Sequence, residues 1–202
     1  MSPRKSVVEA AATRARIIER ALTLGAVDGL EGLTIGRLAI DLGMSKAGVI
    51  GQFGTKEALQ LAVVDEAVER FRSRVPGHAL GAHPGIERLS RAFEEWIDYM
   101  TEDEDHRGCF LTSVAIEYDD RPGPVRDAIL AALSRWSDYV SAELDEAVKL
   151  GELPHDTDVP QLVFELGGVA LAVQQALLMH HDPTAADRGR RSVHRILNTH
   201  AH

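Results

Sequence analysis

The sequence predicts an all-α fold of about nine helices, divided into a small N-terminal domain and a larger C-terminal domain. Of its 202 residues, 45% are hydrophobic, which is sufficient for a packed core. Apolar residues recur at spacings of three and four along most of the chain, and no alternating β pattern persists. We therefore predict a three-helix domain with a helix-turn-helix in residues 1–54 and a helical C-terminal domain in residues 55–202.

Four helices are predicted in the first part of the chain, at residues 14–28, 35–42, 46–52 and 56–74. Gly29 and Gly43 follow the last periodic residues of the first two helices and are expected to end them. Thr34, Ser45 and Thr55 each precede a helix, and their hydroxyl oxygens can accept the unpaired N–H groups of its first turn.

Five further helices are predicted after a loop at residues 76–84, which begins and ends with proline. They cover residues 86–100, 109–117, 125–148, 158–180 and 184–197. The helix over residues 158–180 is apolar on more than one side, so it must be buried on two sides. We expect one of its faces to meet the core of its own domain and the other to meet a second subunit; a central core helix of a monomer remains the alternative.

Residues 34–53 carry the most informative pattern, because two short helices flank the turn Gly43-Met44-Ser45. A helix-turn-helix needs this arrangement, with a glycine that accepts a positive φ in the turn. Leu38, Leu42, Val49 and Phe53 are predicted to face inward. The face left for a major groove comprises Lys46, Ala47, Gly48, Ile50, Gly51 and Gln52. A plain helical hairpin would show the same bare pattern.

The segment from Arg14 to Leu59 resembles the DNA-binding domain of the TetR family of transcriptional repressors. The matching residues include Ile18, Ala21, Leu22, Thr34, Ile35, Leu38, Ala39, Leu42, Gly43, Ser45, Lys46, Val49, Phe53, Lys56, Glu57, Ala58 and Leu59. The resemblance implies a cytoplasmic homodimer that binds a pseudo-palindromic double-stranded operator, represses transcription and is released by a small molecule. A helical protein of similar fold that binds a partner or carries a ligand is the competing hypothesis.

The resemblance also implies DNA contacts for Thr34, Ser45, Lys46, Ala47, Gly48 and Lys56. The face left for the major groove adds Ile50, Gly51 and Gln52, and Arg37 is a further candidate for a contact with the DNA backbone. Thr34 and Lys56 are expected to meet backbone phosphates, Lys56 at the positive end of a helix. Ile50 and Gly51 depart from the family pattern, which usually has a tyrosine followed by a polar residue here. Gln52 then becomes the best candidate for reading an adenine edge.

The C-terminal helices are expected to enclose an unidentified apolar or amphipathic small molecule and to form a two-fold interface. The candidate pocket residues are Trp96, Tyr99, Met100, Phe110, Val114, Glu117, Trp136, Tyr139, Phe164 and Gln174. The candidate interface residues are Leu162, Leu166, Val169, Val173, Leu177, Val193 and Leu197.

Composition argues against several other classes of protein. The net charge is −9, but residues 1–53 hold seven Lys or Arg against five Asp or Glu. This asymmetry indicates that the slightly basic N-terminal part and the acidic remainder have different functions. The single cysteine, Cys109, fits a reducing cytoplasm, and no apolar run approaches the roughly 20 residues that span a bilayer. The nine histidines form no i,i+4 pair, and no catalytic constellation stands out. We therefore predict no cofactor, no metal, no membrane contact and no enzymatic activity.

Overall fold

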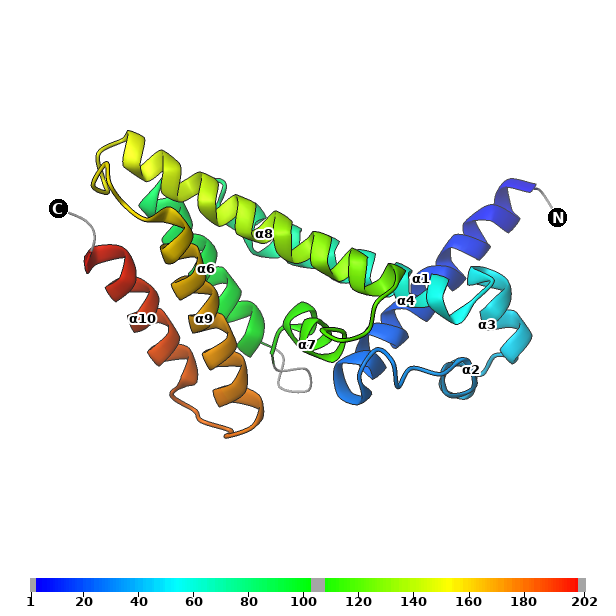
Figure 1. Cartoon of the computed structure of the whole chain (residues 1–202). Coiled ribbons are helices and arrows are strands. Elements are labelled where there is room, and N and C mark those ends of the chain that lie inside the picture. The colour runs from blue at the N-terminus through cyan, green and yellow to red at the C-terminus, as the bar shows by residue number, and fades with distance from the viewer. Residues whose placement is uncertain (1–2, 103–107, 200–202) are drawn as a thin grey trace. The chain divides into compact units, whose positions relative to one another are not determined.

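The computed structural model describes residues 3–102 and 108–199, and these residues form helices joined by turns and loops (Figure 1). The ten helices are α1 (Pro3–Asp28), α2 (Ile35–Leu42), α3 (Lys46–Phe53), α4 (Lys56–Arg74), α5 (Pro76–Ala79), α6 (Ile86–Thr101), α7 (Phe110–Glu117), α8 (Pro124–Lys149), α9 (Val159–Leu178) and α10 (Ala185–Thr199). The predicted all-α class is confirmed. The helix beyond the expected nine is α5, a single turn inside the predicted loop.

Helix α1 begins eleven residues earlier than the sequence pattern predicted, at Pro3 instead of Arg14. Residues 8–12 of this extension are exposed, and Val8 is 65% exposed. A helix that packs against nothing shows no apolar stripe, so periodicity alone does not reveal it. The alanines at positions 10–12 favour a helix through their intrinsic propensity instead.

The chain folds into two compact units. The first unit comprises Met1–Glu69 and Ser113–Leu130, and the second comprises Arg70–Thr112 and Ala131–His202. Helices α4, α7 and α8 therefore each contribute residues to both units. The functional division after residue 54 stays a prediction, since these units follow packing and not function.

In the first unit, α1, α2 and α3 pack against one another around a core that also takes residues from α4. Ile17 and Ala21 from α1, Leu38 from α2, Val49 from α3 and Leu59 from α4 are all completely buried. Complete burial of a large aliphatic side chain contributes about 1.5–3 kcal/mol, so these residues fix how the short helices cross.

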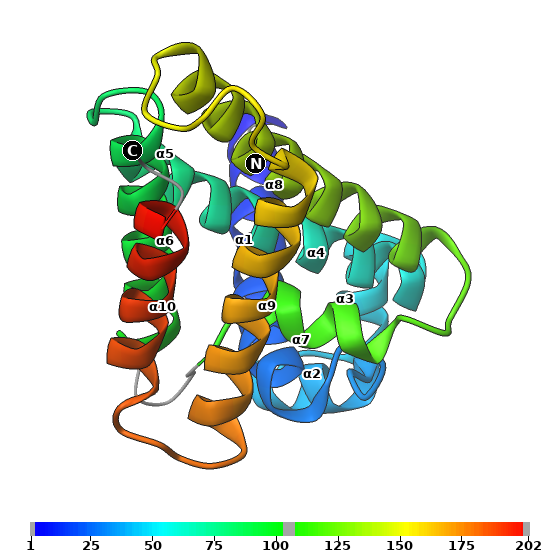
Figure 2. The ribbon, with the colours of Figure 1, turned by 60° about the vertical axis from the view of Figure 1, so that its left-hand side comes forward.

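In the second unit, α6, α9 and α10 pack against one another, and α9 and α10 run side by side (Figure 2). The inner faces of these helices form one core, with Leu89 and Met100 from α6, Leu166 from α9 and Leu197 from α10 at most 1% exposed. Gly189 of α10 allows close packing, because a Cβ there would lie 2.6 Å from Val173 Cγ2.

Helix α9 is long and apolar enough to cross a membrane by length and composition, and it is the one candidate among the described residues. The core helix of a packed protein passes the same test. Seven of its residues are buried in the second unit, among them Leu162, Leu166 and Leu177. Its apolar character is therefore explained by packing on its inner side and by an exposed apolar face on its outer side.

Candidate functional site

The two helices of the predicted helix-turn-helix are capped by the residues that the sequence indicated. Thr34 has an extended backbone, and its Oγ1 accepts a hydrogen bond of 3.2 Å from the Arg37 N–H. Ser45 Oγ accepts one of 3.0 Å from the Gly48 N–H, and Thr55 Oγ1 accepts one of 3.0 Å from the Ala58 N–H. Each cap satisfies an N–H that the helix leaves unpaired and is worth about 1 kcal/mol.

The turn between α2 and α3 is set by Gly43, whose φ of +63° lies in the left-handed region. The N–H groups of Gly43 and Met44 donate to the carbonyl oxygens of Ile40 and Ala39, which satisfies the C-terminal end of α2. This arrangement is a common helix ending. It redirects the chain so that α3 starts three residues later.

The predicted DNA-contacting residues lie where they can be reached. Thr34, Arg37, Ser45, Lys46, Ala47 and Gly51 are exposed, and Gly48, Ile50, Gln52 and Lys56 are half-buried. A Cβ built on Gly51 would meet no atom within 4 Å, so this side of α3 is open. The structure thus leaves one face of α3 free of its own protein, which a groove-reading helix requires.

Arg37 and Lys56, two cations outside α3 that were predicted to contact DNA, both have acidic partners within the first unit. Arg37 Nη1 lies 2.6 Å from Asp28 Oδ2. Lys56 Nζ donates to the Glu31 carbonyl oxygen at 2.7 Å and lies 3.3 Å from Glu31 Oε1. Each cation must share or exchange its acidic partner to bind a phosphate.

Arg14 is a positioning residue, a role that the sequence pattern did not indicate. Its Nη1 donates to the Gln52 carbonyl oxygen at 2.7 Å, and its guanidinium lies 4.2 Å from the centre of the Phe53 ring. A cation at the C-terminal end of a helix satisfies a free carbonyl and complements the helix dipole. Arg14 therefore attaches the end of α3 to α1.

Glu117, predicted as a polar pocket residue, binds the loop between α1 and α2 instead. Its Oε2 accepts from the Leu30 N–H at 2.8 Å and its Oε1 from the Glu31 N–H at 2.7 Å. Both carboxylate oxygens are used, which leaves Glu117 poorly suited to a ligand. Val114, the other predicted pocket residue in the first unit, is 1% exposed and packs in its core.

Aromatic side chains of the second unit form a cluster, which we call the aromatic cluster: Phe71, Phe93, Trp96, Tyr99, Trp136 and Tyr139. The Phe71 ring packs edge-on against Trp96, Tyr99 and Trp136, with centroid distances of 5.9, 6.2 and 5.2 Å. Phe71 was not among the pocket residues predicted from the sequence. It lies seven residues after the buried Val64 and so extends the apolar stripe of α4.

Two polar atoms in the aromatic cluster have no partner. Among the described residues, Trp96 Nε1 and the Tyr139 hydroxyl are the buried side-chain polar atoms without a hydrogen bond. Burial without a partner costs about 1–3 kcal/mol per group. Such atoms call for an explanation, and a bound hydrogen-bond acceptor would supply one.

The remaining predicted pocket residues are divided between core, loop and surface. Met100 is 1% exposed and belongs to the core of the second unit, and Phe110 is half-buried. The Gln174 side chain accepts from the Cys109 N–H at 2.7 Å and donates to its carbonyl oxygen at 3.3 Å. Phe164 is 76% exposed on α9, so it lies on the outer surface of the unit and lines no enclosed pocket within it.

Six of the seven predicted interface residues are buried inside the chain itself, between 0 and 7% exposed: Leu162, Leu166, Val173, Leu177, Val193 and Leu197. They form the core of the second unit, because the inner and outer stripes of α9 are both apolar and the sequence does not say which is which. The seventh residue, Val169, lines a groove between α9 and α10 together with Gly168, Ala172, Ser192 and Ile196.

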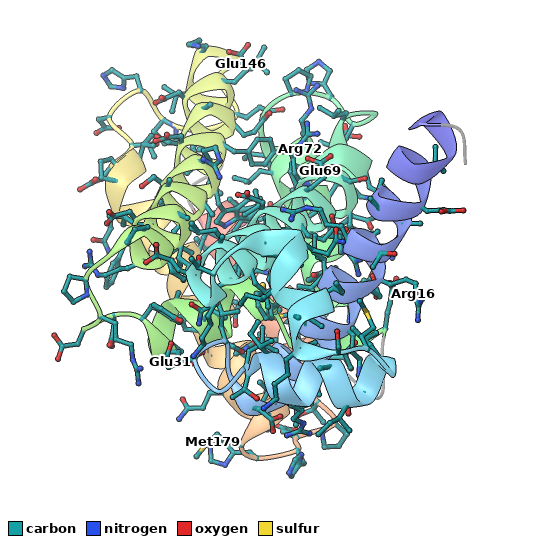
Figure 3. The ribbon with its side chains drawn as sticks, turned by 90° about the vertical axis from the view of Figure 1, so that its right-hand side faces the viewer. Arg16, Glu31, Glu69, Arg72, Glu146 and Met179 are labelled. Atoms are coloured by element: carbon teal, nitrogen blue, oxygen red, sulfur yellow. The ribbon has the colours of Figure 1, made fainter. Side chains whose placement is uncertain are left out.

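The outer face of α9 carries exposed apolar side chains. Phe164, Leu171 and Leu178 are 76, 53 and 37% exposed and follow one another at seven-residue spacing. That spacing places them in one line along a helix. Met179 at the end of the same helix is 72% exposed (Figure 3). We call Phe164, Leu171 and Leu178 the α9 stripe.

The three tyrosines of the chain carry protonated hydroxyls far above neutral pH. Burial, followed by an electrostatic effect of the neighbouring Cys109, raises the pKa of Tyr99 to about 12. Burial and Glu143 raise the pKa of Tyr139 to about 12, and burial and Glu31 raise the pKa of Tyr118 still further.

We therefore predict that the native protein forms little phenolate at pH 10.5. The folded-state pKa values exceed the unfolded value of about 10, so the folded state keeps protons that the unfolded state releases. The stability due to this effect is complete below pH 10 and is lost as the pH rises through 10 to 12. Near-ultraviolet absorbance during a pH titration, with and without urea, measures the fraction of tyrosine that is ionised. Half-ionised tyrosine in the native protein at pH 10 would contradict the prediction.

The described residues contain no group of three or more His, Cys, Asp or Glu side chains that could hold a metal ion. Two histidines near the C-terminus, His200 and His202, lie outside the described residues.

Comparisons with known proteins agree with this geometry. A family model described as the tetracyclin repressor-like C-terminal domain matches residues 85–193. No curated protein matches the sequence. Among solved structures, a TetR transcriptional regulator from Chloroflexus aurantiacus J-10-FL is 22% identical, with 96% of this chain and 98% of that chain covered and a TM-score of 0.86.

Two further structures contain ligands. A regulator from Saccharomonospora viridis in complex with choline is 20% identical, with 95% of this chain and 98% of that chain covered and a TM-score of 0.82. AibR, in complex with isovaleryl coenzyme A and operator DNA, is 20% identical, with 89% and 95% covered and a TM-score of 0.74. At these identities the likeness establishes the fold.

The matched family model extends over more than half of the 202 residues, and a capped helix-turn-helix precedes it. The chain therefore belongs to the TetR family of transcriptional regulators.

Proposed function

We propose that this protein is a homodimeric repressor that binds a pseudo-palindromic operator and releases it when a small molecule binds. The observation that carries the DNA-binding part is the helix-turn-helix of α2 and α3, with both helices capped and one side of α3 open. Lys46 and Gln52 are the side chains of α3 best suited to reading base edges. Thr34 and Lys56 supply phosphate contacts that set the orientation of α3.

The α9 stripe and the neighbouring groove support the homodimer. Single exposed apolar residues are normal on a protein surface, but three in one line beside a groove mark an association site. Gly167 and Gly168 lie within this region, and a Cβ on either would meet nothing within 4 Å, so a partner helix can approach closely. A two-fold axis here would present two copies of α3 to half-sites about 34 Å apart.

The aromatic cluster supports the small-molecule part of the proposal. Its six rings offer an apolar environment, and Trp96 Nε1 and the Tyr139 hydroxyl are available to donate hydrogen bonds to a ligand. A ligand with an apolar body and a carbonyl, hydroxyl or similar oxygen matches these groups. Because both tyrosine hydroxyls in the cluster stay neutral, Tyr139 can donate a hydrogen bond to such an oxygen without carrying a charge. The ligand must favour the conformation that binds DNA less well.

Selection of bound duplexes from a random pool tests the proposal. We expect enrichment of a sequence with two-fold symmetry and half-site centres about ten base pairs apart. With that operator, Lys56→Ala should weaken binding about tenfold and reduce the salt dependence of log K by about one, because one phosphate contact is lost.

Lys149→Ala serves as the matched control. Lys149 lies at the end of α8, pairs with Glu146 at 3.0 Å and belongs to the second unit, so its removal changes the net charge equally without touching α4. Equal effects of the two substitutions would refute the role of Lys56. A pool without any enriched palindrome would refute operator binding itself.

A further inference from the structure

The loop between α1 and α2, residues 29–34, is bound by side chains from α4 and by the segment at the end of α7. Figure 3 shows Glu31 on this loop. Glu117 at the C-terminus of α7 holds the Leu30 and Glu31 N–H groups. Gln60 of α4, which is 4% exposed, donates to the Leu30 carbonyl oxygen at 3.0 Å. All of these residues belong to the first unit.

The Glu31 side chain is held by the same elements. The hydroxyl of Tyr118, which is 6% exposed, donates to Glu31 Oε2 at 3.2 Å. Gln60 Nε2 lies 3.2 Å from Glu31 Oε2 and 3.0 Å from the Tyr118 hydroxyl oxygen. The hydrogen bond from Gln60 and the charge of Lys56 lower the pKa of Glu31, so this carboxyl is ionised at neutral pH.

The ionised carboxylate faces Lys56 at the first turn of α4. Lys56 donates a hydrogen bond to the Glu31 carbonyl oxygen, and its ammonium forms an ion pair with the Glu31 carboxylate at 3.3 Å. Lys56 and Glu31 are 38 and 48% exposed, so a phosphate can still approach, but it meets an ammonium whose charge is already balanced. A carboxylate next to a phosphate also repels it.

We propose that Glu31 is a built-in counter-charge to Lys56, held in place by Tyr118 and Glu117, and that it limits how strongly this end of α4 attracts DNA phosphates. The inference rests on the proposed function, because it assumes that Lys56 meets DNA. It adds that affinity is set from within the protein: the segment around residues 117–118 determines where the Glu31 carboxylate lies. Tyr118 and Glu117 act as positioning residues and need no contact with DNA.

Binding of the full-length protein to a labelled 30-base-pair random-sequence duplex, over a series of salt concentrations, tests the inference. Glu31→Gln should raise the affinity about three- to fivefold near 0.1 M salt, the range expected for removing one exposed ion pair. It should also make the dependence of log K on log salt steeper by about one. Tyr118→Phe removes the hydroxyl that holds Glu31 and should give a smaller change in the same direction.

Glu57→Gln is the matched control, because it makes the same charge change in the turn of α4 that carries Lys56. Glu57 is exposed, and its side chain is not the one that pairs with Lys56. The decisive comparison uses Lys56→Ala: the gain from Glu31→Gln should be clearly smaller when it is added to Lys56→Ala, because only direct repulsion of the phosphate is then removed, whereas the effect of Glu57→Gln should be unchanged. A gain from Glu31→Gln that equals that of Glu57→Gln, or that is undiminished in Lys56→Ala, would overturn the counter-charge.

The two proposals fail in different ways in this experiment. If the unaltered protein binds no duplex even at 20 mM salt, the proposed function fails and the counter-charge fails with it. If the unaltered protein binds and Lys56→Ala weakens it, but Glu31→Gln changes nothing, the function stands and only the counter-charge is wrong. Hydrogen exchange of the Leu30 and Glu31 amides, which should be faster in Glu117→Ala, checks that the loop is held as described.

Discussion

Leu171→Glu should convert the proposed homodimer to a monomer and abolish binding to a two-fold operator. Leu171 is the middle member of the α9 stripe and is 53% exposed in the single chain. In a two-fold interface each substitution would place two carboxylates near the axis, where burial without partners costs several kcal/mol each. We expect the dimer dissociation constant to rise by at least about a thousandfold, which corresponds to about 4 kcal/mol.

Sedimentation velocity at micromolar concentration measures the change, and Leu80→Glu is its control. Leu80 is 66% exposed at the C-terminal end of α5 and belongs to the same unit, but it lies off the α9 stripe. The control should remain a dimer and keep its operator affinity. A dimeric Leu171→Glu protein would show that the chains associate through another surface. A monomeric one that still binds the operator tightly would show that pairing is not required for recognition.

The choice of Leu171 illustrates what the sequence alone could and could not predict. Periodicity identified α9 as apolar on two sides, and the structure agrees. However, hydropathy cannot rank two apolar stripes on one helix, so Leu162 and Leu166 were assigned to the interface and prove to be core. Only the positions of α6 and α10 decide which stripe is covered.

The helix-turn-helix was predictable because its information is local. A cap such as Ser45 and a turn glycine such as Gly43 act on residues within one helical turn, so their roles follow from short-range spacing. Glu117 shows the opposite case. Its partners at Leu30 and Glu31 lie 86 or 87 positions away in the chain, and no local pattern links them. The role of a polar residue that binds distant backbone therefore cannot be predicted from local spacing.

This long-range contact also yields the second large prediction, that Gly29→Ala destabilises the first unit. Gly29 has a φ of +80°, and a left-handed conformation costs an alanine about 1–2 kcal/mol. In addition, a Cβ on Gly29 would lie 2.9 Å from Glu117 Oε1 and 3.1 Å from Cδ. The carboxylate must then move away from the Leu30 and Glu31 N–H groups, which adds about 1–3 kcal/mol for donors left unpaired.

Gly43→Ala separates these two contributions. Gly43 has a φ of +63° and a ψ of 32° in the left-handed region and lies in the same unit, but a Cβ there meets nothing within 4 Å. This control should therefore show the backbone cost alone. In urea unfolding, the free energy of unfolding of Gly29→Ala should be about 1–3 kcal/mol lower than that of the control. Adding Glu117→Ala to each variant should cost less in the Gly29→Ala background, because the contact is already lost there. Equal costs in both backgrounds would mean that Glu117 retains its hold on the loop, and that the close approach of its carboxylate to Gly29 does not govern the stability of this unit.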